Sequence, residues 1–354
     1  MELALYRPET GYYARAAQRS GRAGDFFTSV DVGPLFGQLL AIQIEEMASI
    51  VDGERFDLVE AGAGNGRLSA DILRTLHTRD THLYQTIDLH LVEASRPARG
   101  AQRAVLDDVG DRLQSSAADL PASFEGVLIA NELLDAMPVH QVVMRADGLR
   151  EVFIEHSDEG YRLCERLPST PRLAEYLDAA GARLEPGWRG EINLNAVDWV
   201  RDASRRLRRG FMILIDYGHE ARDLYSASHS AGTLTTFSGH RSAGAESRTP
   251  EWLQSPGEQD ITAHVDFTSV RAAAESGGMA TLGFLDQTYF LLALVQSGLA
   301  GQPAADSQPS AISHQQLKTL VLPGGLGSTM KVLILGKKVG RPALRGCSFR
   351  MRVT

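Results

Sequence analysis

A glycine-rich turn constrains the fold of this chain more than any other feature of its sequence. In the stretch FDLVEAGAGNGRLSADILR (residues 56–74), a short apolar run predicts a buried strand, and the residues after the turn predict a helix. Three glycines, Gly62, Gly64 and Gly66, stand at alternate positions between the two. Such a turn removes Cβ atoms where a ligand must come close, and it leaves free backbone N–H groups at a helix N-terminus. We therefore expect one unit of an α/β fold with a ligand site at its turn.

The same alternation of strands and helices continues along the chain. Apolar runs predict further strands, and segments with apolar residues at three- and four-residue spacing predict helices. The order strand, helix, strand, helix, strand is typical of a parallel sheet that helices cover on both faces. We predict strands at 56–62, 87–95, 126–130, 210–218, 279–287 and 328–338, and helices at 34–51, 67–77, 96–110, 170–184, 193–207, 267–278 and 289–300.

Three regions depart from this pattern. Residues 141–166 alternate in twos around two glycine turns, which predicts a meander of antiparallel strands. Residues 1–34 and 219–262 are weakly periodic and predict loops, and a loop as long as the second is usually functional or disordered. We therefore divide the chain into an N-terminal lid segment and helix (1–50), a core (51–140 and 210–354), and an inserted meander with helices (141–209) that is expected to face the substrate.

Composition narrows the class of protein. The chain has 354 residues, of which 43% are hydrophobic and 23% charged, as in ordinary globular proteins. Its formal net charge of −8 argues against nucleic-acid binding, and the basic cluster at 205–209 is interpreted as a solvated helix end. The sequence has neither a long apolar run nor a leader, so we expect no membrane insertion and a cytoplasmic location. Its two cysteines and ten histidines form no metal-binding motif, and no metal site is predicted.

The residues near the glycine turn indicate which ligand it holds. The spacing is G-x-G-x-G rather than the G-x-G-x-x-G of dinucleotide sites, and Glu60 lies just upstream. A carboxylate there repels a pyrophosphate but suits S-adenosylmethionine, which carries a sulfonium and an ammonium group. Glu60 would orient the turn or meet the ammonium, Glu93 at the next strand end would hold the ribose, and Asp119 would meet the adenine edge. A dinucleotide site, or a tight turn whose acids only cap helices, is the alternative.

A second polar corner follows the next strand, in IANELLDAMPVHQ (residues 129–141). Ligands of an open parallel sheet lie beyond the carboxyl ends of its strands, so Asn131, Glu132 and Asp135 should face the same crevice as the turn. Methyl transfer needs an aligned nucleophile, and two carboxylates could clamp a guanidinium and polarise it toward one nitrogen. Alternatively, Asp135 caps a helix and Glu132 is merely solvated. His264 could take a proton from the product, although a lone loop histidine is more often structural.

Eight stretches spread along the chain carry a resemblance to a known family: LYRPETGYYAR, GDFFTSVDVGPLFGQLLA, LVEAGAGNGRLSADILR, IANELLDAMPVHQ, LIDYG, GTLTTFSGHR, DITAHVDFTSV and MKVLILGKK. Taken together, they resemble the MidA/NDUFAF7 family of class I S-adenosylmethionine-dependent methyltransferases. The mitochondrial members of that family are arginine methyltransferases tied to respiratory complex I assembly. The resemblance extends over almost the whole chain, although the family's "SPE" is "SVD" here and its turn usually carries Pro and Arg where this one has Ala63 and Asn65.

The resemblance implies a seven-stranded Rossmann-like class I methyltransferase sheet with helices on both faces and inserted β-meander and helical segments. It implies a methyltransferase that uses S-adenosylmethionine, releases S-adenosylhomocysteine and modifies an arginine-bearing protein, in the cytoplasm of bacteria and the mitochondrial matrix of eukaryotes. A homodimer, a non-catalytic S-adenosylmethionine-binding assembly factor and an NAD-linked oxidoreductase stay open. By motif, the turn glycines match the cofactor loop, Asn131, Glu132 and Asp135 match the family corner, Tyr12, Tyr13, Asp25, Thr28 and Ser29 match the lid, and His240, His264 and Asp266 match loops bordering the substrate.

Overall fold

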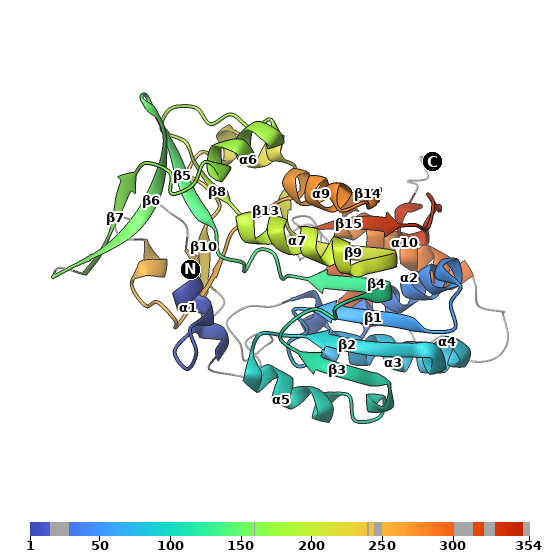
Figure 1. Cartoon of the computed structure of the whole chain (residues 1–354). Helices are drawn as coiled ribbons and strands as arrows, with labels where there is room; N and C mark the ends of the chain where they lie inside the picture. The colour runs from blue at the N-terminus through green and yellow to red at the C-terminus, as the bar shows by residue number, and fades with distance from the viewer. Residues whose placement is uncertain are drawn as a thin grey trace.

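A large, mostly parallel sheet forms the centre of the molecule (Figure 1). The computed structural model describes residues 1–14, 28–158, 160–238, 241–243, 250–300, 314–321 and 330–349. The strand order is β14-β15-β9-β4-β1-β2-β3, and β13 also pairs with β9. Only β15 runs antiparallel to its neighbours β9 and β14 within this described sheet. The strands are β1 (Phe56–Ala61), β2 (Ile87–Val92), β3 (Leu113–Ala117), β4 (Phe124–Asn131), β9 (Leu207–His219), β13 (Val265–Asp266), β14 (Ala280–Asp286) and β15 (Met330–Lys337).

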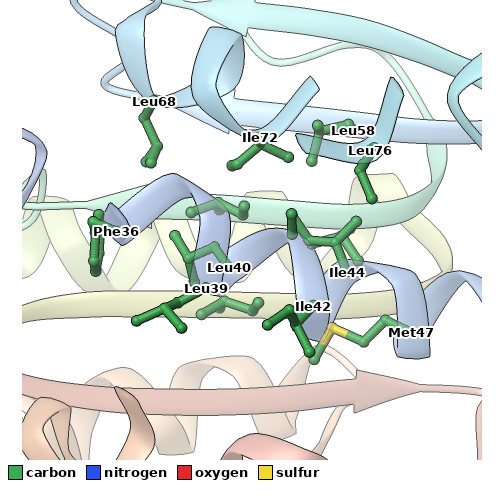
Figure 2. Packing of buried hydrophobic residues seen from close by; sticks show 14 of the residues in the cluster. Phe36, Leu39, Leu40, Ile42, Ile44, Met47, Leu58, Leu68, Ile72 and Leu76 are labelled. Carbon is green, nitrogen blue, oxygen red and sulfur yellow. The ribbon is translucent and has the colours of Figure 1, made fainter. Parts of the chain in front are cut away.

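Helices cover both faces of this sheet because the strands are apolar on both sides. Along β1, Leu58 packs into one core cluster and its neighbour Val59 into the other. Figure 2 shows side chains of α2 facing those of α3 and Leu58 in the first cluster. The first face carries α2 (Leu35–Val51), α3 (Arg67–Arg79), α4 (Thr81–Thr86), α10 (Gln287–Ala300) and α11 (His314–Val321), and the second carries α6 (Arg172–Ala180), α7 (Leu194–Arg206), α8 (Ala221–Leu224) and α9 (Phe267–Ser276), while α5 (Arg96–Val105) packs beside α3 and β3.

Two smaller sheets and the N-terminal segment lie to one side of the central sheet (Figure 1). The predicted meander is confirmed as the antiparallel strands β5, β6 and β7, and the later strand β8 completes a four-stranded sheet in the order β7-β6-β5-β8. Its strands are β5 (His140–Arg145), β6 (Gly148–Ser157), β7 (Gly160–Arg166) and β8 (Arg189–Ile192), and a further sheet contains β10 (Thr235–Ser238), β11 (Arg241–Ala243) and β12 (Asp260–Thr262). The N-terminal segment forms α1 (Glu2–Tyr6), η1 (Tyr12–Ala14) and η2 (Ser29–Val32), and the other short turns are η3 (Gly110–Arg112), η4 (Ala227–His229), η5 (Glu251–Leu253) and η6 (Arg345–Cys347).

Two expectations about secondary structure were wrong. Residues 1–34 and 219–262 were expected to be loops, but they contain α1, α8 and three strands. Their apolar residues have no clear period, and they are held by a third core cluster that includes Leu5, Tyr12, Trp252 and Ile261. The basic cluster at 205–209 is not a helix end throughout, because α7 stops at Arg206 and the last two arginines lie in β9 near Glu125.

Among the described residues, no helix has both the length and the apolarity that crossing a membrane requires.

Two paired glycines allow β4 and β9 to approach closely. Gly126 and Gly210 are register partners with φ of 149° and 132°, and a Cβ on Gly210 would lie 1.9 Å from the carbonyl oxygen of Gly126. We expect Gly210→Ala to lower the free energy of unfolding by about 2–4 kcal/mol, since backbone strain adds to the clash. Urea unfolding would measure this. Gly100→Ala in α5, where a Cβ meets no atom within 4 Å, is the control and should be neutral or slightly stabilising. Equal stability of the two variants would contradict the argument.

Candidate active site

The glycine turn between β1 and α3 is held in a conformation that favours glycine. Gly62, Gly64 and Gly66 have φ of 72°, 52° and 84°, all in the left-handed region. A Cβ on Gly62 would lie 3.2 Å from the side chain of Leu133, whereas a Cβ on Gly64 would meet nothing within 4 Å. The turn is therefore packed against the protein at Gly62 and open at Gly64, where a ligand can approach the backbone.

Two of the predicted acids hold this turn in place. The backbone N–H of Gly64 donates to Oε2 of Glu93 at 2.8 Å, and the N–H of Ser95 donates to Oε1 at 2.7 Å. Glu60 is buried and accepts hydrogen bonds from both the N–H and the hydroxyl of Ser69 in α3, and burial raises its pKa to about 7. These contacts favour the first of its two predicted roles, which was to orient the turn. Asp119 is exposed just beyond β3, and its contact with an adenine ring stays a prediction.

The second corner begins where β4 ends at Asn131. Glu132 follows with a φ of 52°, which is unusual for a residue with a side chain, and its N–H donates to the carbonyl of Ile215 at 2.8 Å. Its Oε1 accepts from Nδ2 of Asn131 at 3.2 Å and from the N–H of Ser29 at 3.3 Å. The other amide atom of Asn131, Oδ1, is buried and has no hydrogen-bond partner among the described residues. An orphaned acceptor at this edge is suited to a ligand that donates.

Three carboxyl groups gather at this corner, of which those of Asp135 and Asp216 belong to buried residues and that of Glu132 to a half-buried one. Asp216 in β9 accepts from the N–H groups of Leu133 and Leu134 at 3.1 and 2.8 Å, and burial raises its pKa to about 7. Burial raises the pKa of Glu132 to about 8, and burial with the charges of Asp216 and Glu132 raises that of Asp135 well above its usual range. No helix lies in the described segment between β4 and β5, so Asp135 is not a helix cap. Glu132 is half-buried rather than fully solvated.

A short segment of the predicted lid joins the turn to the corner. The N–H and hydroxyl of Thr28 donate to Oδ2 of Asp31 at 2.9 and 2.8 Å, and Asp31 also forms an ion pair with Arg67 at the start of α3. Ser29, next in the chain, donates its N–H to Glu132. The "SVD" that departs from the family pattern therefore supplies an acid that anchors this segment to the glycine-turn helix.

The N-terminal tyrosines dock over the other side of the site. The hydroxyl of Tyr13 donates to Oδ1 of Asp260 at 2.8 Å, and its carbonyl accepts from the hydroxyl of Ser95 at 2.8 Å. The ring of Tyr6 stacks on that of Tyr13 with 5.5 Å between centroids, and Tyr12 is fully buried. This segment thus bridges the turn after β2 and the strand β12. Two other predicted residues, Asp25 and His240, lie outside the described residues.

Comparison with known proteins then assigns the chain to a family. Residues 39–285 match the sequence profile of a family described as "Putative S-adenosyl-L-methionine-dependent methyltransferase". The chain belongs to this methyltransferase family. It is 30% identical to "Protein arginine methyltransferase NDUFAF7, mitochondrial" of Mus musculus over 87% of this chain and 74% of that protein. The protein of the same name from Homo sapiens is also 30% identical, over 82% of this chain and 68% of that protein.

A solved structure similar to this methyltransferase carries the demethylated cofactor. A candidate methyl transfer enzyme from Burkholderia thailandensis, bound to S-adenosyl-homocysteine, matches 98% of this chain and 88% of its own with a TM-score of 0.84 and 30% identity. The predicted class I methyltransferase sheet is therefore confirmed, and so is S-adenosylmethionine as the cofactor. The same two findings leave the dinucleotide alternative without support.

The residues of the site fit S-adenosylmethionine. Gly64 leaves open space above the backbone, and Glu93 keeps lone pairs that can accept from ribose hydroxyls although each of its oxygens already accepts one N–H. The orphaned Oδ1 of Asn131 can accept from an ammonium group. Buried acids around these groups favour a cation over a phosphate. These roles of individual residues stay predictions.

Two of the remaining predicted residues lie in surroundings that differ from expectation. Asp266 accepts from the N–H groups of Thr268 and Ser269 at 2.9 and 3.3 Å, which are the contacts of a helix N-cap for α9. The ring of His264 packs against those of His219 and His229, and burial lowers its pKa to about 4. A histidine with so low a pKa is a weak base, so its contacts fit poorly with the proposed removal of a proton.

Sequence reasoning missed four polar residues that build the site. Asp31 was noted only as a departure from the family pattern, and Arg67, Asp216 and Asp260 were not singled out for a role. One of them carried a usable signal: Asp216 follows the apolar run FMILI, and acids at the ends of parallel strands converge at one edge of a sheet. The pairs Arg67–Asp31 and Tyr13–Asp260 join distant segments and leave no local pattern.

The raised pKa of Glu132 makes stability depend on pH. Its pKa rises from 4.5 to about 8 on folding, so the folded chain keeps a proton that the unfolded chain has released at neutral pH. This difference lowers the free energy of unfolding of the wild type. The loss is small near pH 4.5, grows as the pH rises toward 8, and is at most about 5 kcal/mol above pH 8. We expect Glu132→Gln to be more stable than wild type at about pH 9 and to lose most of this advantage at about pH 5. Urea unfolding at both values would measure it, and a pH-independent difference would contradict the prediction.

Proposed function

We propose that this chain is a protein arginine N-methyltransferase whose substrate guanidinium enters the corner formed by Glu132 and Asp135. The observation that supports this most is the gathering of three carboxyl groups with raised pKa values, Glu132, Asp135 and Asp216, beside the glycine turn. Buried acids with raised pKa values are costly to ionise unless a cation joins them. A guanidinium stays charged at all ordinary pH values and presents a planar fork of donors that matches carboxylates. The names of the mouse and human relatives point to the same acceptor.

The proposed reaction depends mainly on position. Bound S-adenosylmethionine supplies an electrophilic methyl group on a positively charged sulfur. Glu132, whose Oε1 is held by Asn131 and Ser29, would accept hydrogen bonds from the guanidinium and direct one nitrogen toward that methyl group. The carboxyl cluster would take up the proton that the methylated nitrogen releases. Tyr6 and Tyr13, stacked over the site, would exclude water.

We further propose that the inserted meander receives the protein segment around the target arginine. An open pocket of about 690 Å³ lies beside this sheet and is lined by residues that include Gln141, Leu163, Trp188, Arg189 and Trp252. Oε1 of Gln141 is buried and has no hydrogen-bond partner among the described residues, which suits a backbone N–H of a bound peptide. Trp252 also packs in the third core cluster with Tyr12, so the pocket adjoins the N-terminal segment.

A transfer assay tests the proposal. Protein extract from cells that lack this chain would be incubated with the purified chain and isotope-labelled S-adenosylmethionine, and modified peptides would be identified by mass spectrometry. We expect label on arginine nitrogen in a small set of proteins. Label on another residue would overturn the acceptor. Tight binding of S-adenosylhomocysteine without any transfer would overturn the enzyme and favour a non-catalytic assembly factor.

A further inference from the structure

Three histidines from separate segments converge beside the carboxyl end of β9. His219 is the last residue of β9, His229 ends η4, and His264 lies between β12 and β13. Each offers one ring nitrogen, and the three nitrogens lie within 4.8 Å of one another. The ring centroids are separated by 4.9, 5.3 and 6.0 Å. We propose that these three side chains bind a zinc ion.

The hydrogen bonds around the triad leave nitrogens available for a metal. Nδ1 of His229 lies 2.9 Å from the backbone carbonyl oxygen of Asp223. Because a carbonyl can only accept, this nitrogen carries the proton, and Nε2 of the neutral ring keeps its lone pair. Holding a ligand histidine through its other ring nitrogen is the usual supporting arrangement in metal sites.

His264 supplies a second, independent indication of a ligand. Its Nδ1 is buried and has no hydrogen-bond partner among the described residues. A buried polar atom without a partner is costly, and a bound cation would remove that cost. The backbone N–H of His264 donates to Oγ1 of Thr233 at 3.1 Å, which fixes the position of the residue from which the ring extends.

The ligand set favours zinc over the other common cations. Three imidazole nitrogens without a carboxylate match the three-histidine arrangement that holds Zn²⁺ and leaves a fourth position for water. Magnesium and calcium prefer oxygen ligands, and a non-haem iron site replaces one histidine with a carboxylate. Besides His229, the charged groups that act on His219 are Lys331, Asp223 and Asp286, and Lys331 is paired with Asp286.

An ion here would join three segments next to the proposed active site. It would tie the end of β9 to the turn η4 and to the loop between β12 and β13. The loop between β12 and β13 is hydrogen-bonded to the second corner, because the N–H of Ala263 donates to the carbonyl of Asp135 at 3.0 Å. The site is separate from the residues that contact cofactor or substrate in the proposed function, so its test does not depend on methyl transfer.

Metal titration tests the inference. The full chain, purified without a histidine tag and stripped with a chelator, would be titrated with Zn²⁺ in a calorimeter and with Co²⁺ by visible absorption. We expect one ion per chain, a tetrahedral Co²⁺ spectrum and a higher melting temperature with Zn²⁺. Losing a ligand should weaken binding at least as much as losing a supporting group does, so His219→Ala, His229→Asn and His264→Ala should each bind about 100-fold more weakly or worse.

Two controls separate loss of the site from loss of the fold. His82→Ala removes an exposed histidine in α4 and should bind Zn²⁺ as wild type does. His229→Asn changes a residue in a short surface turn, so its binding of S-adenosylhomocysteine and its melting temperature without metal should stay near wild type. Absence of a one-to-one site in the wild-type chain, or full Zn²⁺ affinity in His229→Asn, would overturn the inference.

Discussion

Replacing Glu132 with glutamine is expected to slow methyl transfer by about 10²–10⁴-fold while the affinity for S-adenosylhomocysteine stays near wild type. Glutamine keeps the size of the side chain, and its carbonyl oxygen can accept the hydrogen bonds from Ser29 and Asn131 that Oε1 accepts now. It cannot carry a negative charge, so it neither clamps a guanidinium nor takes up its proton. The change therefore removes an interaction that is made in the transition state and spares the cofactor site.

Single-turnover kinetics and calorimetry with S-adenosylhomocysteine would measure the two effects separately. The matched control is Glu125→Gln, which makes the same chemical change near the first residue of β4, at the opposite end of that strand from the corner that contains Glu132. That variant should turn over at a rate within about twofold of wild type. Equal losses of cofactor affinity and rate in Glu132→Gln would contradict the catalytic role and point to a role in binding or folding.

The sequence predicted the central sheet well because the signal is local and repeated. Runs such as FMILI in β9 are apolar at every position, which fits a strand buried between two layers of helices. Predictions failed where a segment is ordered by distant contacts. The helix α1 has no clear period of its own, and its Leu5 is buried in a core cluster whose other members include Trp252 and Ile261, more than two hundred positions away.

The same distinction, between local sequence signals and contacts between distant segments, separates the parts of the candidate site that could be predicted from those that could not. The glycine turn and the corner at Glu132 follow strands directly, and parallel strands bring their carboxyl ends to one edge, so sequence order alone brings these motifs together. The histidine triad could not be found this way, because His219, His229 and His264 have no recognisable spacing and meet only when β13 pairs with β9. The expectation that the chain has no metal site was drawn from spacing alone.

Replacing Gly64 with valine is expected to weaken binding of S-adenosylhomocysteine by about 100-fold or more, which corresponds to about 3 kcal/mol. A side chain at this position would meet no protein atom, so it would project into the space where the cofactor must approach the backbone. The left-handed φ of 52° adds strain of about 1–2 kcal/mol, which would lower stability without preventing folding.

Gly181→Val separates the strain from the obstruction. Gly181 follows α6 with a φ of 65°, and a Cβ there also meets nothing within 4 Å, so the variant pays a similar backbone penalty far from the glycine turn. We expect the two variants to lose similar stability in urea unfolding, and only Gly64→Val to lose affinity in calorimetry. If both variants bound S-adenosylhomocysteine as wild type does, the cofactor could not lie against Gly64. If both lost affinity equally, the loss would reflect general destabilisation, and the glycine turn would no longer be supported as the cofactor site.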